Sequence, residues 1–138
     1  MKKTADPIAQ DFFPITPKVY KYPLDNGWMV MAGKTDVDND ILSLKTARPN
    51  DWWFHVCGMP GSHVILTGNG DAEPSKDLLR RAAAIAAYHS KAREGGTVPV
   101  SATRARYVSK PRGAKPGTVT IRKEIVLKVR PAIPTPSS

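Results

Sequence analysis

Residues 51–66, DWWFHVCGMPGSHVIL, constrain the fold more than any other stretch of this chain. Two runs of β-forming residues flank a Gly-Met-Pro-Gly segment, a pattern that predicts a β-hairpin. The hairpin carries His55, Ser62 and His63, and a purely structural hairpin needs neither histidine. Because the Pro-Gly pair of the turn fixes the backbone, we expect Ser62 and His63 to leave it in a set direction, exposed to a ligand or partner.

Turn and capping signals divide the first part of the chain into a predicted hairpin and a predicted short helix. Residues 18–24 and 28–32 flank Asp25-Asn26-Gly27, and the Asn-Gly pair predicts a tight hairpin turn because it tolerates positive φ. Residues 36–45 carry a short apolar stripe at helical spacing and predict a short helix. Asp36 or Asp38 is its expected N-cap.

A longer helix is predicted over residues 75–94, with Ser75 as its N-cap and a Gly-Gly pair after its end. Three β segments follow, at residues 97–103, 118–122 and 124–129. The element order predicts an α+β fold, a single domain with one mostly antiparallel sheet and one long and one short helix packed on the same face.

The chain has 138 residues, enough for one domain with its own core. We expect an extended lead-in over residues 1–17, the folded domain over residues 18–131 and a disordered tail over residues 132–138. The single cysteine, Cys57, excludes an internal disulfide and favours a reducing compartment. With no signal peptide and no membrane-spanning stretch in the sequence, we expect a cytoplasmic protein that binds no membrane.

Positive charge is segregated along the sequence. Residues 1–96 carry 12 Lys and Arg against 11 Asp and Glu, whereas residues 97–138 carry nine against Glu124 alone. Nearly all of the net charge of +9 therefore lies in the last third, interleaved with strand residues. A solvated, solubilising face is one interpretation of this pattern, and a polyanion-binding face is the one that we favour.

The segment SKPRGAKPG, residues 109–117, concentrates this charge. Two prolines stiffen it, two glycines allow close backbone approach, and Lys110, Arg112 and Lys115 supply three cations. This combination favours contact with phosphates. The segment lacks the GxxxxGK[ST] spacing of a P-loop, so it does not predict nucleotide hydrolysis.

The histidines allow other interpretations. His55, Cys57 and His63 are metal-ligand types, but a tetrahedral zinc site would need a fourth ligand and His89 is the only other histidine. We therefore expect no metal and no cofactor. Ser62 and His63 are adjacent on a strand and point to opposite faces, so they do not form a catalytic dyad. A pair of histidines, His55 and His63, acting as acid and base on RNA remains an alternative, as does a structural role for His55.

The hairpin sequence D-x-W-F-H-V…P-G-S-H-V-I-L closely resembles the NFACT-R domain. Further motifs occur in the order typical of that family: Asp25-Asn26-Gly27-Trp28 with Gly33-Lys34 and Asn39-Asp40, then residues 86–93, then the segments around residues 98–100, 108–111 and 113–119. The resemblance covers roughly residues 20–131. The family typically has Arg where Lys34 stands and often a polar or basic residue where Cys57 stands.

The NFACT-R domain occurs inside the long ribosome quality-control proteins of the RqcH and NEMF type and as a small stand-alone protein. The resemblance implies RNA binding, with tRNA or ribosomal RNA as partner and the ribosome as a setting. Peptide-tailing activity is not carried over, because the coiled coil and amino-terminal domain of the long proteins have no counterpart in this sequence.

We therefore expect an RNA-binding protein without enzymatic activity. An RNA-processing or RNA-modifying enzyme that uses the two hairpin histidines is one alternative, and a DNA-binding or protein-docking module is another. The predicted nucleic-acid-binding residues are Lys34, Asn39, Asp40, His55, Ser62, His63, Arg80, Lys91, Arg93, Lys110, Arg112 and Lys115.

Overall fold

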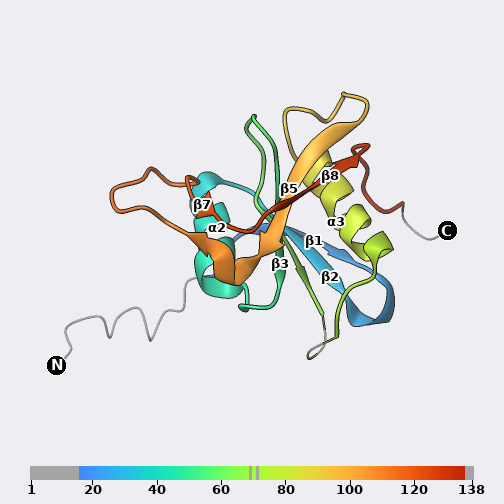
Figure 1. The fold of residues 1–138 in the computed structure, drawn as a ribbon, viewed down its shortest axis with the longest axis horizontal. Helices are drawn as coiled ribbons and strands as arrows, with labels where there is room; N and C mark the ends of the chain where they lie inside the picture. The colour runs from blue at the N-terminus through green and yellow to red at the C-terminus, as the bar shows by residue number, and fades with distance from the viewer. Residues whose placement is uncertain (1–15, 69, 71, 136–138) are drawn as a thin grey trace.

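Antiparallel strands form the framework of the molecule (Figure 1). The computed structural model describes residues 16–68, 70 and 72–135. The strands are β1 (Val19–Pro23), β2 (Met29–Gly33), β3 (Trp52–Val56), β4 (Val64–Thr67), β5 (Val98–Arg104), β6 (Val108–Ser109), β7 (Thr120–Ile121) and β8 (Ile125–Val129). Six of them pair in the order β1-β2-β4-β3-β5-β8, and β6 and β7 form a separate ribbon. The predicted α+β class is confirmed; the short strand β6 was not predicted.

The two helices cover opposite faces of the sheet, so the expectation that they share one face is wrong. Helix α3 (Lys76–Tyr88) packs against a cluster that includes Phe54 and Val64, whereas the π-helical turn η2 (Leu42–Thr46), which continues α2 (Asp36–Ile41), packs against Trp53 and Ile65. Side chains alternate between the faces of a strand, and β3 and β4 carry apolar residues at successive positions. Both faces of the central strands must therefore be covered.

The predicted hairpins are confirmed. Between β1 and β2, Asn26 and Gly27 have φ values of 57° and 83°, the positive values for which an Asn-Gly pair is suited. In the central hairpin, Trp53 pairs with Ile65. Trp53 is 3% exposed and belongs to the core.

The structure confirms the predicted start of α3, but it differs from the prediction at the end of α3 and at the N-cap of α2. Ser75 caps α3 as predicted, with its hydroxyl accepting a hydrogen bond from the amide of Leu78 at 3.1 Å. The helix ends at Tyr88 rather than near residue 94, because the residues after it bond to the central hairpin. The N-cap of α2 is Thr35, whose Oγ1 accepts from the amide of Asp38 at 3.1 Å, and neither predicted aspartate takes that role.

Residues 1–15 of the predicted lead-in and residues 136–138 of the predicted tail lie outside the described residues. At the start of the predicted tail, the amide of Ala132 donates to the carbonyl oxygen of Ala84 at 3.1 Å, and Ile133 packs against the core beside α3. None of the helices in the described part of the chain combines the length and hydrophobicity needed to cross a membrane.

Candidate nucleic-acid interface

An open groove of about 380 Å³ lies at the end of the sheet where β2 ends and the turn of the central hairpin meets the end of α3. Its walls come from four stretches of chain that are far apart in the sequence. It gathers five of the predicted site residues, namely Lys34, Asn39, Ser62, Lys91 and Arg93. Three of these are exposed cations, so the groove offers an electropositive surface suited to a phosphate backbone.

Backbone hydrogen bonds fix the floor of the groove. The amide of Ser62 donates to the carbonyl oxygen of His89 at 2.8 Å, and the amide of Lys91 donates to that of Pro60 at 3.1 Å. The hydroxyl of Ser62 donates to the carbonyl oxygen of Gly33 at 2.6 Å. Ser62 is therefore half-buried and ties the hairpin turn to both β2 and the end of α3. This leaves its hydroxyl oxygen to accept, rather than donate, a further hydrogen bond.

Aromatic side chains that sequence reasoning missed line one wall. The ring of Tyr20 stacks on His89 with 4.6 Å between centroids, and Lys34 Nζ lies 4.7 Å from the centroid of Tyr20. Arg93 lies over the ring of Tyr88 at 4.1 Å. These contacts hold two of the groove's cations in defined positions. The alternation of tyrosine at 20 and 22 on a predicted strand was the available sequence signal, but it does not indicate which partner the rings meet.

His89 contributes shape rather than charge to this wall. Its Nε2 lies 2.6 Å from the hydroxyl of Tyr22, and burial together with the nearby charge of Arg93 lowers its pKa to about 4. The imidazole is therefore neutral near pH 7. The positive charge of the groove comes from Lys34, Lys91 and Arg93.

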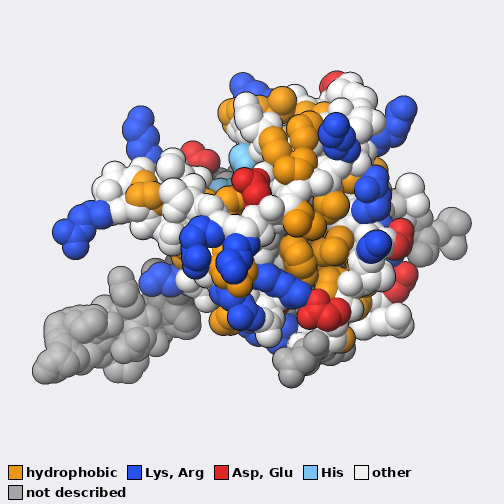
Figure 2. All heavy atoms as spheres, viewed as in Figure 1, with side chains coloured by type: hydrophobic (Ala, Val, Ile, Leu, Met, Phe, Trp, Pro, Cys, Tyr) orange, Lys and Arg blue, Asp and Glu red, His pale blue; other side chains and the backbone are white. Residues whose placement is uncertain are grey.

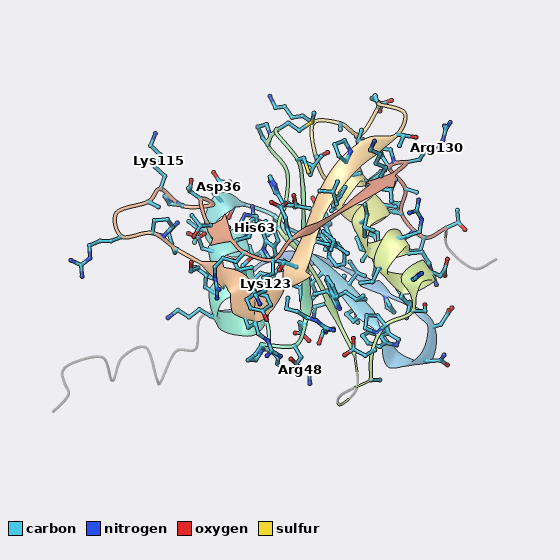
Figure 3. All side chains as sticks on the ribbon, viewed as in Figure 1. Asp36, Arg48, His63, Lys115, Lys123 and Arg130 are labelled. Atoms are coloured by element: carbon cyan, nitrogen blue, oxygen red, sulfur yellow. The ribbon has the colours of Figure 1, made fainter. Side chains whose placement is uncertain are left out.

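The expectation that the hairpin turn exposes His63 is wrong. His63 is 2% exposed, with Nδ1 2.8 Å from the hydroxyl of Ser43 and Nε2 3.1 Å from the carbonyl oxygen of Gly117. Burial, reinforced by the neighbouring His55, lowers its pKa to about 4. The residue lies on the strand side of the turn, beneath η2 and the β6–β7 loop, and both ring nitrogens are already engaged (Figure 3).

The two hairpin histidines lie on one face of the sheet. Their ring centroids are 5.6 Å apart, and His55 also stacks on Trp53 at 6.0 Å. Burial lowers the pKa of His55 below its usual value. This stack favours the structural interpretation of His55 that the sequence left open.

Cations of the β6–β7 loop have two different roles. Lys110 forms an ion pair with Asp40 at 3.1 Å and donates to the carbonyl oxygens of Lys115 and Thr118, at 2.6 and 2.9 Å. It therefore holds the loop together. The side chains of Arg112 and Lys115 are exposed, and neither forms an ion pair with another described residue. In Figure 3, Lys115 extends away from the body of the molecule.

Asn39 and Asp40 each accept a hydrogen bond from a backbone amide of another segment. Asn39 is 4% exposed, and its Oδ1 accepts from the amide of His63 at 3.1 Å. Asp40 Oδ1 accepts from the amide of Gly117 at 3.0 Å, which anchors the base of the basic loop on α2. These acceptors position the hairpin and the loop relative to each other.

Arg80 lies apart from the groove. It donates to the carbonyl oxygen of Lys128 at 2.8 Å and belongs to a basic patch between α3 and β8 with Arg81, Lys128 and Arg130. Figure 2 shows Lys and Arg side chains both on the β6–β7 loop and across the β5–β8 side of the molecule. Among the residues that the structure describes, no group of three or more His, Cys, Asp or Glu side chains is arranged to hold a metal ion.

The chain is similar to known proteins over most of its length. The chain is 38% identical over 118 residues to the Rqc2 homolog RqcH of Bacillus subtilis, covering 86% of this chain and 20% of that protein. It is 42% identical over 107 residues to the Rqc2 homolog RqcH of Streptococcus suis, covering 78% of this chain and 19% of that protein. It thus spans about a fifth of the length of these relatives.

A solved structure has the same fold. The C-terminal part of the fibronectin/fibrinogen-binding protein from Streptococcus suis superposes with a TM-score of 0.76 at 38% sequence identity, covering 86% of this chain and 46% of that one. Residues 18–123 match the family described as the NFACT protein RNA binding domain. The chain belongs to the NFACT RNA-binding domain family.

Proposed function

We propose that this protein binds structured RNA, either tRNA or ribosomal RNA, by laying a phosphate backbone along the groove between the hairpin turn and the end of α3. The observation that carries the proposal is that three cations converge around a floor fixed by backbone hydrogen bonds. Lys34 comes from the segment just after β2, and Lys91 and Arg93 come from the segment after α3. Phosphate contacts of this kind position a nucleic acid without reading its sequence.

The basic loop extends this surface. Asp36 lines the groove, and a side chain on Gly117 would lie 2.9 Å from the carboxylate of Asp36, so the base of the loop is adjacent to the groove. Arg112 and Lys115 at its outer part are available for a second stretch of phosphates. The two surfaces together favour a folded RNA over a short single strand, because a folded RNA can present phosphates to the groove and to the loop at the same time.

The RqcH relatives and the sequence resemblance favour the ribosome, in the cytoplasm, as the setting and translation quality control as the process. We propose a binding role without catalysis. Ser62 and His63 already hydrogen bond to protein groups, and His55 stacks within the sheet, so the hairpin offers no exposed acid–base pair.

The proposal is tested by replacing Lys34, Lys91 and Arg93 together with Gln and measuring the affinity for tRNA and for a ribosomal RNA fragment across a salt series. The slope of log K against log salt should become shallower by about two to three units, since each of the three lost phosphate contacts contributes roughly 0.7 to 0.9. The matched control replaces three exposed lysines outside the groove and the loop, Lys21, Lys45 and Lys76.

The control should retain most of the salt dependence. Equal effects of the two triple variants would mean that RNA is held by diffuse charge, and the groove would then not be the binding site. Unfolding midpoints of both variants, measured in urea, separate lost contacts from lost structure.

A further inference from the structure

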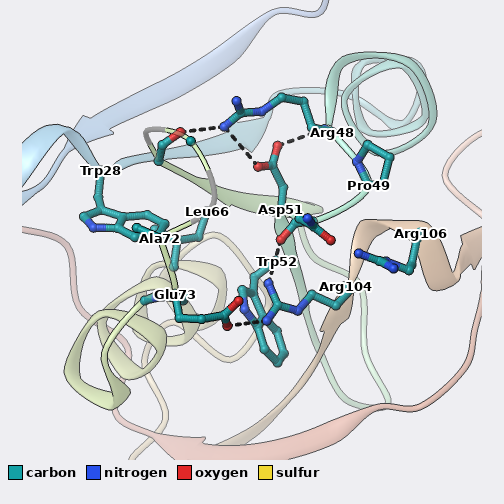
Figure 4. Close-up of a pocket in the computed structure, with 14 residues that line it drawn as sticks. Trp28, Arg48, Pro49, Asp51, Trp52, Leu66, Ala72, Glu73, Arg104 and Arg106 are labelled. Carbon is teal, nitrogen blue, oxygen red and sulfur yellow. Dashed lines mark hydrogen bonds and ion pairs between the residues drawn. The ribbon is translucent and has the colours of Figure 1, made fainter.

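A second pocket, of about 350 Å³, lies at the end of the sheet opposite the groove (Figure 4). It is bounded by the starts of β2 and β3, the ends of β4 and β5, and the segment that leads into α3. The groove adjoins Ser62 and the pocket adjoins Gly68, two residues that flank β4 and are six positions apart. At about 3.3 Å per residue the two sites are therefore about 20 Å apart.

A planar stack forms one wall of the pocket. The guanidinium of Arg104 lies over the ring of Trp52 at 4.6 Å from its centroid. Its orientation is fixed by a hydrogen bond of 2.7 Å to the carbonyl oxygen of Asn50 and by an ion pair with Glu73. The Arg104 side chain is still 23% exposed. The pocket thus presents a prearranged guanidinium plane supported by an indole (Figure 4).

Trp28 provides a second aromatic wall. An ideal Cβ on Gly68 would lie 2.5 Å from the Trp28 ring, so the ring packs directly on the backbone there. Arg48 fixes the rim between the walls by bonding to Thr67 Oγ1 at 2.8 Å and by an ion pair with Asp51 at 3.5 Å. These contacts arrange the walls before any ligand binds, which lowers the entropic cost of binding.

From this geometry we propose that the pocket binds a single unpaired nucleobase, stacked on the Arg104–Trp52 plane. Arginine planes and aromatic rings are the groups on which proteins stack splayed-out RNA bases. The volume is at the lower end of the range for small-ligand sites, which suits one base and its ribose. Arg106 also lines the pocket and is exposed, so this cation can contact the phosphate of the bound nucleotide.

The pocket is tested directly with nucleoside 5′-monophosphates, so the test does not depend on RNA binding by the groove. Two of the three tryptophans line the pocket. We expect saturable quenching of tryptophan fluorescence by the nucleotides and none by ribose 5-phosphate, which lacks a base. Equal binding of ribose 5-phosphate would overturn the proposal, because it would identify a simple anion site. Absence of binding by all four nucleotides would overturn it as well.

Two variants locate the bound base. Arg104→Lys keeps the charge and removes the plane, and Ala72→Phe fills the pocket from an exposed position at its rim. Each should weaken nucleotide binding by about 5- to 150-fold, the range for a lost base–aromatic contact. The urea unfolding midpoint of Ala72→Phe checks that its fold is intact. Unchanged binding in Ala72→Phe would overturn the proposal.

RNA titrations distinguish this proposal from the proposed function. Arg104→Lys should weaken binding of RNA that has unpaired bases and leave both duplex RNA and the salt slope unaffected. The Lys34, Lys91 and Arg93 triple variant should weaken binding of both RNA types and leave the mononucleotide affinity unchanged. An equal loss for duplex and unpaired RNA in Arg104→Lys would count against base stacking.

Discussion

The Nε2 atom of His63 lies 3.1 Å from the carbonyl oxygen of Gly117, 54 positions away in the sequence, and this contact joins the central hairpin to the basic loop. Asp40 reinforces the junction from α2, because it accepts from the amide of Gly117 and pairs with Lys110. The two motifs that stand out in the sequence are therefore parts of one assembly. The histidine holds the assembly together from within, while the exposed cations face outward.

Removing His63 should therefore destabilise the protein. His63→Ala leaves the Ser43 hydroxyl and the Gly117 carbonyl oxygen without this partner and opens a cavity under η2. We expect a loss of about 2–4 kcal/mol in the free energy of unfolding, measured in urea. The salt slope for RNA, measured at a temperature where the variant is folded, should stay as in the wild type. A lower slope at unchanged stability would show that His63 contacts phosphate.

Stability should also depend on pH through His63. Its pKa is about 4 in the folded protein against about 6.5 unfolded, so between these values the unfolded state binds more protons. The stabilisation is complete above pH 6.5 and is lost as pH falls towards 4, by about 3 kcal/mol at most. His89 acts in the same direction. Urea unfolding at pH 7, 6, 5 and 4.5 measures the trend, and His63→Gln should flatten it.

Gly61 is required for close approach rather than for positive φ. An ideal Cβ on Gly61 would lie 2.8 Å from Ser90 Cβ and 3.1 Å from Val56 Cγ1, and its φ is not among the positive values. Gly61→Val should therefore separate the hairpin from the end of α3, lower the urea unfolding midpoint and weaken RNA binding. Gly96→Val is the matched control, because a side chain there meets no atom within 4 Å. Equal midpoints for the two variants would contradict this account.

Substitutions of the loop cations should have different effects, because the exposed cations and Lys110 have different roles. Arg112→Gln with Lys115→Gln should reduce the salt slope for RNA by about one to two units without affecting stability. Lys110→Met should instead loosen the loop, because it removes the pairing with Asp40 and two carbonyl contacts. Amide hydrogen exchange over residues 110–118 measures that loosening. Unchanged exchange in Lys110→Met would mean that Lys110 does not hold the loop together.

Absence of catalysis is also testable. Purified protein incubated with labelled tRNA, with and without magnesium or zinc, should leave the RNA intact and unmodified, because the hairpin presents no exposed acid–base pair. The matched comparison is His55→Ala, which retains the groove cations. Turnover by the wild-type protein that is abolished in His55→Ala would establish the alternative of an RNA-modifying enzyme.

Local signals in the sequence were sufficient for most of the elements and for the α+β class. The hairpin turn at Asn26, the Ser75 cap and the alternating apolar strands each depend on neighbours within a few residues, which is why they could be predicted. The helix after Ser75 was predicted too long. Its end is set by two hydrogen bonds with the hairpin turn, from the amide of Ser62 to the carbonyl oxygen of His89 and from the amide of Lys91 to that of Pro60, which no local pattern encodes.

Tertiary packing decided which predicted site residues are accessible. From the sequence, Ser62-His63 after a Pro-Gly turn and Asn39-Asp40 before an apolar stripe have the composition of exposed contacts. In the fold, His63 and Asn39 are buried and bonded to each other, while Tyr20 and His89 come together to form the wall of the groove. Burial depends on what the rest of the chain places above a residue. The sequence alone therefore determined most of the elements and the family resemblance, and the tertiary structure decided which residues form the surface.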